Sequence, residues 1–199
     1  MLARTLSIAL IGLEGVKVEV EIDSNLGQPA LVLIGLPSQT IDESRERITA
    51  ALRNCHIRIK SKRTIVNLAP ADIRKTSAHF ELAIAVAILK MYGEVQVATD
   101  TTYFFGELSL DGTLKKIVGA LPLVLAAQRS GATDVVVPES NAAELAVVTT
   151  IKIHPIQHLK EFIDFGRGKK ALPTLVPQKF ESLQLDSEPP SQFDFCHIV

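Results

Sequence analysis

At 199 residues, of which 47% are hydrophobic, the chain is long enough for one to one-and-a-half domains with a substantial core. Its formal net charge of −1 gives no overall attraction to a polyanion, so a nucleic-acid surface would have to be a local basic patch. Two widely separated cysteines and the lack of a long apolar run exclude a disulfide scaffold and a membrane-spanning segment, so we expect a reduced, cytoplasmic setting.

The first part of the chain predicts a hairpin, a third strand and a helix. Val16, Val18, Val20 and Ile22 alternate with charged residues, which is the period of a half-buried strand. Strands are therefore expected at 7–12 and 16–22, joined by a turn at 12–15. A further strand is expected at 30–34, where the wholly apolar run indicates a central position in the sheet, and a helix capped by Ser38 is expected to end near Asn54.

The rest of the chain alternates short strands and helices up to about residue 168. Residues 80–91 are apolar nearly all round and predict a buried helix after a loop at 67–77. The other expected elements are strands at 57–60, 64–67, 103–108, 113–117, 134–137 and 151–153, and helices at 121–129, 141–148 and 156–165. Prolines among polar residues predict a linker or tail over 169–199. Residues 1–168 are thus expected to form one mixed α/β domain.

Four segments, in this order along the chain, together resemble one protein family. They are GLPSQTIDESRERITAALRN, TIVNLAPADIRKTSAHFELAIAVAIL, FFGELSLDGTLKKIVGALP and VVVPESNAAELAVV. They resemble the N-terminal domain of the Mg-chelatase-like AAA+ ATPases of the ComM/YifB type, over residues 1–168. The resemblance implies an α/β fold, with a mixed sheet packed with helices, that is shared with the proteolytic domain of Lon protease and with a domain of a small-subunit ribosomal protein.

In proteins of that type an ATPase module follows this domain, and the closing FDFCHIV resembles the residues just before it. The phosphate loop of such a module has the pattern G-x-x-x-x-G-K-[ST], which the chain does not contain, because GRGKK at 166–170 has the wrong spacing. The resemblance therefore implies that ATP and Mg belong to a missing module. We expect no ATP hydrolysis, no cofactor and no metal site in this chain, whose only histidine pair of helical spacing, His154 and His158, is interrupted by Pro155.

The likeness to Lon raises the hypothesis of a Ser–Lys peptidase, in which a lysine activates a serine hydroxyl. When the two sequences are matched by their glycines, the lysine position falls on Leu121 and the serine position falls near Glu81. Ser77 with Lys115 or Lys116 is an alternative pair, although the two lysines suit a solvated hairpin strand. We therefore expect no catalytic residue and no peptidase activity.

A group of basic residues is the candidate nucleic-acid-binding site. Its members are Arg45, Arg47, Arg53, Arg58, Lys60, Lys62 and Arg63. Arg58 and Lys60 are expected on one face of a strand beside a helix, where basic side chains can follow phosphates. No aromatic residue lies among them, so base stacking is not indicated. The alternative is a solvated face that nearby acidic residues partly neutralise, whereas the family resemblance, which points to DNA remodelling in natural transformation, favours DNA.

A second polar group lies at the junction between the loop and the buried helix. It comprises Asp72, Arg74, Lys75, His79 and Glu81. These residues could form a ligand-binding or subunit-contact loop. The alternative is a helix start that is capped and braced by ion pairs, and the sequence alone favours this second interpretation.

Three functions are consistent with these observations. The first is a non-catalytic accessory domain of a hexameric DNA-acting ATPase, with DNA and subunits of its own family as partners. The second is a protein-interaction or oligomerisation module that does not bind DNA. The third is a Lon-like hydrolase, which the missing Ser–Lys pair disfavours.

Overall fold

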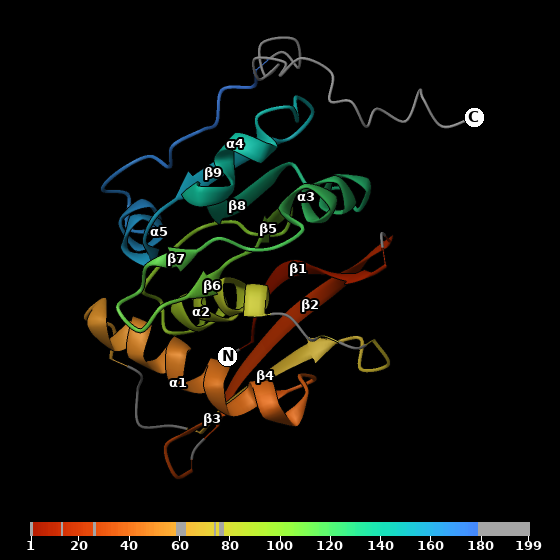
Figure 1. Ribbon diagram of the computed structural model, residues 1–199. Coiled ribbons are helices and arrows are strands. Elements are labelled where there is room, and N and C mark those ends of the chain that lie inside the picture. The colour runs from red at the N-terminus through yellow and green to blue at the C-terminus, as the bar shows by residue number, and fades with distance from the viewer. Residues whose placement is uncertain are drawn as a thin grey trace, which may run out of the picture.

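A mixed β-sheet forms the centre of the protein, as the computed structural model shows (Figure 1). The structure describes residues 2–12, 14–25, 27–58, 63–73, 75 and 78–178, apart from the side chains of Ser38 and Gln39. The sheet consists of β1 (Ala3–Ile11), β2 (Glu14–Asn25), β3 (Ala30–Ile34), β4 (Arg63–Ala69), β5 (Thr102–Phe104), β8 (Asp134–Pro138) and β9 (Lys152–Ile156). A separate two-stranded hairpin is formed by β6 (Glu107–Leu108) and β7 (Leu114–Lys115).

The strand order in the seven-stranded sheet is β3-β4-β2-β1-β5-β8-β9. The strand β2 runs antiparallel to both of its neighbours, β1 and β4. All the other neighbouring pairs are parallel. Among the strands of this sheet, β2 thus runs opposite to the other six, which all point the same way, and the predicted mixed α/β fold is confirmed.

Helices cover both faces of this sheet. They are α1 (Ser38–Asn54), α2 (Glu81–Met91), α3 (Ala120–Arg129), α4 (Ala142–Leu145) and α5 (Leu159–Gly166), with 3₁₀ turns η1 (Ala78–Phe80) and η2 (Glu139–Asn141). Side chains alternate between the faces of a strand, so Phe104 and Val136 belong to one core cluster whereas Phe105, Val135 and Val137 belong to the other. The first cluster contains α1, α2 and α5, and the second contains α3 and α4.

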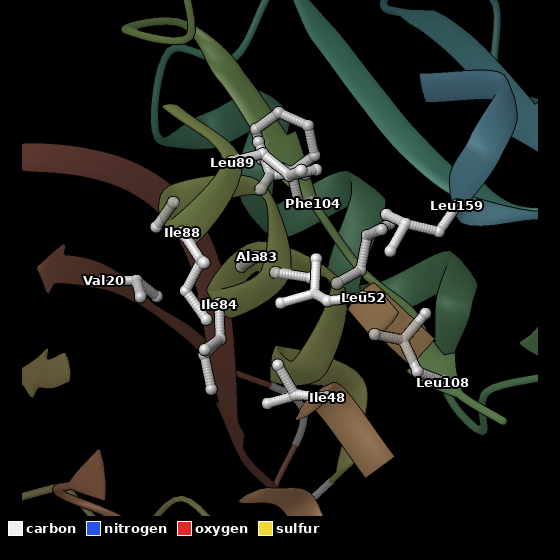
Figure 2. Close-up of a cluster of buried hydrophobic side chains, with 14 of the residues drawn as sticks. Val20, Ile48, Leu52, Ala83, Ile84, Ile88, Leu89, Phe104, Leu108 and Leu159 are labelled. Carbon is white, nitrogen blue, oxygen red and sulfur yellow. The ribbon is translucent and has the colours of Figure 1, made fainter. Parts of the chain in front are cut away.

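The helix α2 lies at the centre of the larger core cluster. Every residue of it except Lys90 is buried, which confirms the helix expected from its apolar composition. It contacts β1 and β2 on one side and α1 on another. Figure 2 shows this packing, with Ile84 and Ile88 of α2 among Val20, Ile48 and Leu52. The amino end of α2 is therefore held on several sides by other elements.

The helix α3 crosses the opposite face of the β1–β2 hairpin at Gly15. A Cβ atom at Gly15 would lie 2.2 Å from the Ala126 Cβ and 2.8 Å from the Ile8 Cγ2. Because well-packed elements cannot take up an extra methyl group without moving, we expect Gly15→Ala to lower the free energy of unfolding by about 1–3 kcal/mol. Urea unfolding can measure this loss. Gly27→Ala is the matched control, since a Cβ there would meet nothing nearer than the Arg63 Cβ at 3.6 Å; equal stability of the two variants would contradict the prediction.

Three local expectations are wrong. The apolar strand β3 is an edge strand rather than a central one, because it comes at the end of the sheet order with β4 as its neighbour. Leu31 and Leu33 belong to the core cluster that includes α1, whereas Ile34 is 49% exposed. The residue that caps α1 is Pro37, with no side-chain hydrogen bond, rather than Ser38. Ile57 and Arg58 lie in irregular chain before β4 and not in a strand.

The segment that follows α5 lies against the domain rather than leaving it at residue 168. Leu172 packs against the first core cluster, and Leu175 packs against the second. The expected tail over 169–199 thus begins with residues in contact with the domain, and its part beyond 178 lies outside the described residues. In the part of the chain that the structure describes, no helix has both the length and the apolar character needed to cross a membrane.

Candidate nucleic-acid interface

The basic residues of α1 are divided between different faces of the helix. Arg45 forms an exposed ion pair with Asp42, with 2.7 Å between Nη2 and Oδ1. Arg47 points toward the core side, where its Nη2 lies 2.8 Å from the Glu81 Oε1. Six residues separate Arg47 from Arg53, which places them on different sides of the helix. The structure therefore does not bring Arg47 together with the other basic residues, and its charge is already paired with a buried carboxylate.

Two of the candidate arginines meet at the carboxyl end of α1. Arg53 is exposed in the last turn, where a positive charge complements the helix dipole. The chain then turns at His56, whose φ of 61° is left-handed, and is anchored by Ile57, whose N–H donates to the Leu52 carbonyl at 2.9 Å and whose side chain is buried. This anchor presents Arg58 to solvent.

These residues surround a surface hollow of about 560 Å³. Among the described residues its lining consists of Thr49, Arg53, His56, Ile57 and Arg58, none of which is a carboxylate. Arg63, exposed at the start of β4, is the next basic residue that the structure describes. Within the described residues Arg53, Arg58 and Arg63 form no ion pair, in contrast to Arg45 and Arg47. The two remaining candidates, Lys60 and Lys62, lie outside the described residues.

Glu81 stands near the position at which the resemblance to Lon would place the catalytic serine, and its buried carboxylate forms an ion pair with Arg47. Glu81, at the start of α2, is 1% exposed. Its Oε1 accepts hydrogen bonds from the Ser44 Oγ at 2.8 Å and the Arg47 Nε at 2.9 Å, and its Oε2 accepts one from the Leu108 N–H at 2.9 Å. Burial raises the pKa of Glu81, and the hydrogen bonds from Arg47, Leu108 and Ser44 oppose the rise. This arrangement joins α1, α2 and β6, and sequence reasoning did not find it.

The other residues considered for peptidase chemistry are placed in ordinary structural roles. Leu121 is half-buried in α3 and packs against the second core cluster. Lys115 and Lys116 are exposed on and just after β7. Ser77 lies outside the described residues. None of the three described side chains lies in a buried polar setting that would prepare a nucleophile.

The polar group at the junction before α2 does not form one shared site. Lys75 is buried, and its Nζ donates to the backbone carbonyls of Pro70 and Ile73. Burial lowers the pKa of Lys75, and the nearby Asp72 opposes this effect. His79 is also buried and bonds the Ile8 carbonyl through Nε2 at 2.8 Å. Lys75, His79 and Glu81 thus each have different partners, while Arg74 lies outside the described residues.

No group of three or more histidine, cysteine, aspartate or glutamate side chains is placed to hold a metal ion within the described part of the chain. His154 and His158 lie on different elements, the first on β9 and the second at the cap of α5. The Nδ1 of His158 accepts a hydrogen bond from the Lys160 N–H at 3.0 Å, which is a helix-capping contact.

The mixed seven-stranded sheet packed with helices places the chain in the α/β class, and comparison with known sequences identifies the family. The sequence model described as "Subunit ChlI of Mg-chelatase" matches residues 18–141, and the chain belongs to this family. The competence protein ComM of Haemophilus influenzae is 34% identical over 173 residues, which cover 86% of this chain and 34% of ComM. The protein YifB of Escherichia coli is 31% identical over 165 residues, which cover 82% of this chain and 32% of YifB.

A Lon protease of Trichlorobacter lovleyi is a more distant relative, with 25% identity over 178 residues that cover 83% of this chain and 22% of the protease. This likeness agrees with the observed fold. The chain spans about a third of the length of ComM and YifB, two of the curated relatives it matches. These comparisons establish the family and agree with the fold, and they do not assign the activity of the longer relatives to this chain.

Proposed function

We propose that this chain is a non-catalytic accessory domain that binds the phosphate backbone of DNA through the carboxyl end of α1. The binding surface, called here the basic end, consists of Arg53, Arg58 and Arg63, and we include Lys60 and Lys62 from the sequence. The observation that carries the proposal is the hollow beside Arg53 and Arg58, in whose lining the described residues include no acidic side chain. Arginines without carboxylate partners are available to neutralise phosphates.

Similarity to a relative also supports the proposal of DNA binding. ComM is named a competence protein, and it matches most of this chain. Within the proposal the domain acts beside an ATPase module that supplies ATP and Mg chemistry, in a cytoplasmic assembly with other subunits of its family. The domain itself contributes binding and carries no catalytic group. Oligomeric assembly would add several weak phosphate contacts, so weak binding by one domain would be meaningful.

The proposal predicts weak DNA binding that depends on salt and not on sequence. We expect a dissociation constant of roughly 10⁻⁴ to 10⁻⁶ M for unrelated duplexes, because phosphate contacts carry no base information. The double variant Arg53→Glu with Arg58→Glu should weaken binding, and the slope of log affinity against log salt should flatten by about two. Fluorescence anisotropy with labelled duplexes, at low and moderate salt, measures both quantities.

A matched double variant controls for net charge. Arg129→Glu with Lys152→Glu makes the same change in charge at exposed positions on α3 and β9, away from the basic end. This variant should keep its salt slope, and circular dichroism should show that all proteins are folded. If the two double variants lose affinity equally, or if the unmodified chain does not bind at low salt, the interaction-module hypothesis replaces the DNA proposal.

A further inference from the structure

An extended segment after α5 crosses the edge of the sheet. This segment, residues 171–178, is called here the strap. The N–H of Leu175 donates to the carbonyl of Ile153 in β9 at 2.8 Å, and the N–H of Gln178 donates to the carbonyl of Ala146 after α4 at 2.8 Å. Leu172 packs against the core cluster on the α5 face, and Leu175 packs against the one on the α3 face. The strap thus passes from one face of the sheet to the other across β9, and Figure 1 shows it running from α5 toward α4.

Three contacts of the strap with the body of the domain are spaced three residues apart. Leu172, Leu175 and Gln178 make the contacts described above, while Pro173 and Pro177 are exposed between them. The strap belongs to no helix or strand, and the backbone hydrogen bonds of Leu175 and Gln178 go to the domain. Its position therefore depends on a few contacts with the domain. A change at a single side chain can therefore strengthen or weaken the binding of the strap to the domain.

His154 of β9 is the side chain that fastens the strap. Its Nδ1 lies 2.9 Å from the carbonyl oxygen of Pro173, and the hydroxyl of Thr174 lies 3.5 Å from the same nitrogen. Its Nε2 lies 2.9 Å from the Oδ1 of Asp134 on β8. A peptide carbonyl can only accept a hydrogen bond, and an ionised carboxylate can only accept as well. The two contacts can be hydrogen bonds together only when both ring nitrogens carry a proton, which is the imidazolium form.

The surroundings keep Asp134 in its ionised form. Burial alone would raise its pKa, but hydrogen bonds from His154 and Thr133, together with the charge of Lys152, hold the pKa of Asp134 below its ordinary value. His154 and Asp134 also line a cavity of about 210 Å³ beneath Leu172. The other lining residues that the structure describes come from the 97–104 segment, β8, α5 and the strap, and none of these is titratable. Asp134 and Lys152 are therefore the charged groups that act on this contact.

We propose that His154 is a proton-dependent latch that holds the strap across the edge of the sheet. The imidazolium bridges the Asp134 carboxylate and the Pro173 carbonyl, and so ties the strap to β8 and β9. A neutral ring has only one N–H, so one of the two oxygens then faces a nitrogen lone pair and the bridge is broken. Because loss of one ring proton breaks the bridge, the strap is held more firmly at low pH than at high pH. The latch does not depend on DNA binding.

Hydrogen exchange of the whole 199-residue chain, measured by NMR, tests the latch directly. The protection factors of the Leu175 and Gln178 amides, corrected for intrinsic exchange, should fall about tenfold between pH 5.5 and pH 8, the size expected when a charge-assisted hydrogen bond is lost. The amide of Phe105, bonded to the Val136 carbonyl at 3.0 Å within the sheet, is the internal reference and should not follow this change. A flat profile at Leu175 and Gln178 would overturn the proposal.

Variants separate the latch from general effects of pH. His154→Gln keeps a donor but cannot become charged, so its strap amides should show the same protection at both pH values. Asp134→Asn removes the carboxylate and should also abolish the pH dependence. His56→Asn removes an exposed histidine at a left-handed position that asparagine tolerates, and its strap should behave as in the unmodified chain. A pH dependence that persists in folded His154→Gln would assign it to another group and reject the latch.

Discussion

Replacing Glu81 with alanine is expected to lower the free energy of unfolding by about 3–5 kcal/mol. Glu81 is almost completely buried and is the acceptor for a serine hydroxyl, a guanidinium group and a backbone N–H. Its removal would leave the Arg47 guanidinium, whose side chain is 23% exposed, with only its 3.5 Å ion pair to the exposed Glu43, and would leave the Leu108 N–H without an acceptor. Loss of the buried partner of a charge and of the acceptor of a buried N–H both carry desolvation costs.

The loss of stability in Glu81→Ala is expected to come mainly from leaving Arg47 without its partner, and not from the net attraction between Glu81 and Arg47. The double variant Glu81→Leu with Arg47→Met should therefore be more stable than Glu81→Ala, because apolar residues of similar volume remove both charges together. Glu81→Gln should fall between them, since the amide oxygen can still accept from Ser44 or Leu108. Chemical unfolding of the four proteins, with near-ultraviolet circular dichroism to confirm packing, gives the comparison.

An exposed pair on the same helix provides the control. Arg45→Ala removes the partner of Asp42, whose side chain is 75% exposed, and should cost no more than about 1 kcal/mol. If Glu81→Ala costs as little as Arg45→Ala, the buried network does not hold α1, α2 and β6 together.

Much of the fold follows from local sequence patterns. The alternation from Val16 to Ile22 predicted the long hairpin strand β2, and the uniform apolar run of residues 80–91 predicted the buried α2. Both patterns depend on side chains that lie on one face or on all faces of an element, so they can be recognised without long-range information. The helix at 38–54 was predicted with its observed bounds, although its capping residue was not.

What the sequence could not predict depends on contacts between distant segments. The apolar run Ala30–Ile34 has the composition of a central strand, and only the sheet order shows that it lies at an edge. Pro173 and Pro177 predicted a loose tail. Isolated contacts, such as the hydrogen bond between Leu175 and Ile153, leave no periodic pattern in the sequence that would distinguish this segment from a linker. Within the candidate site, spacing along the chain grouped Arg47 with Arg53, although they lie on different sides of α1.

One signal for the Glu81 network was present in the sequence. A carboxylate at the start of a helix that is apolar on all sides needs a buried partner, and the partner had to come from another element. Ser44 and Arg47 lie three residues apart in α1, on the face that also carries Ile48. Polar residues that interrupt the buried face of one helix, opposite a charge in another, would have indicated this pairing.

The protein is expected to lose stability in acid through His79. Burial lowers the pKa of His79 to about 4, and the hydrogen bond to the Ile8 carbonyl opposes this only in part. The side chain packs on Phe80, with 4.1 Å between the ring centroids, and lies near Phe105. In the unfolded chain the same imidazole titrates at its ordinary value of about 6.5. The folded protein therefore resists a proton that the unfolded chain accepts.

The sign of the effect follows from this difference in proton binding. Above pH 6.5 both states are neutral at His79, and its contribution to stability is complete. Between pH 6.5 and pH 4 the unfolded chain binds more protons, so the free energy of unfolding falls as the pH falls, by a total of about 3 kcal/mol for a shift of this size. Below pH 4 both states are protonated and this contribution declines no further.

Urea unfolding at pH 7, 5.5 and 4.5 should reveal this loss as a difference between two proteins. Carboxylates also titrate in this range, so the unmodified chain is compared with His79→Gln, whose amide can still donate to the Ile8 carbonyl but takes up no proton. The variant should be less stable at pH 7, because the ring no longer fills its site between Phe80 and Phe105, but its stability should fall less steeply with acid. His56→Asn, which removes an exposed histidine, should follow the unmodified chain. Equal acid slopes in all three proteins would show that the proton enters His79 without opening the core, and that this histidine does not set the acid limit of the fold.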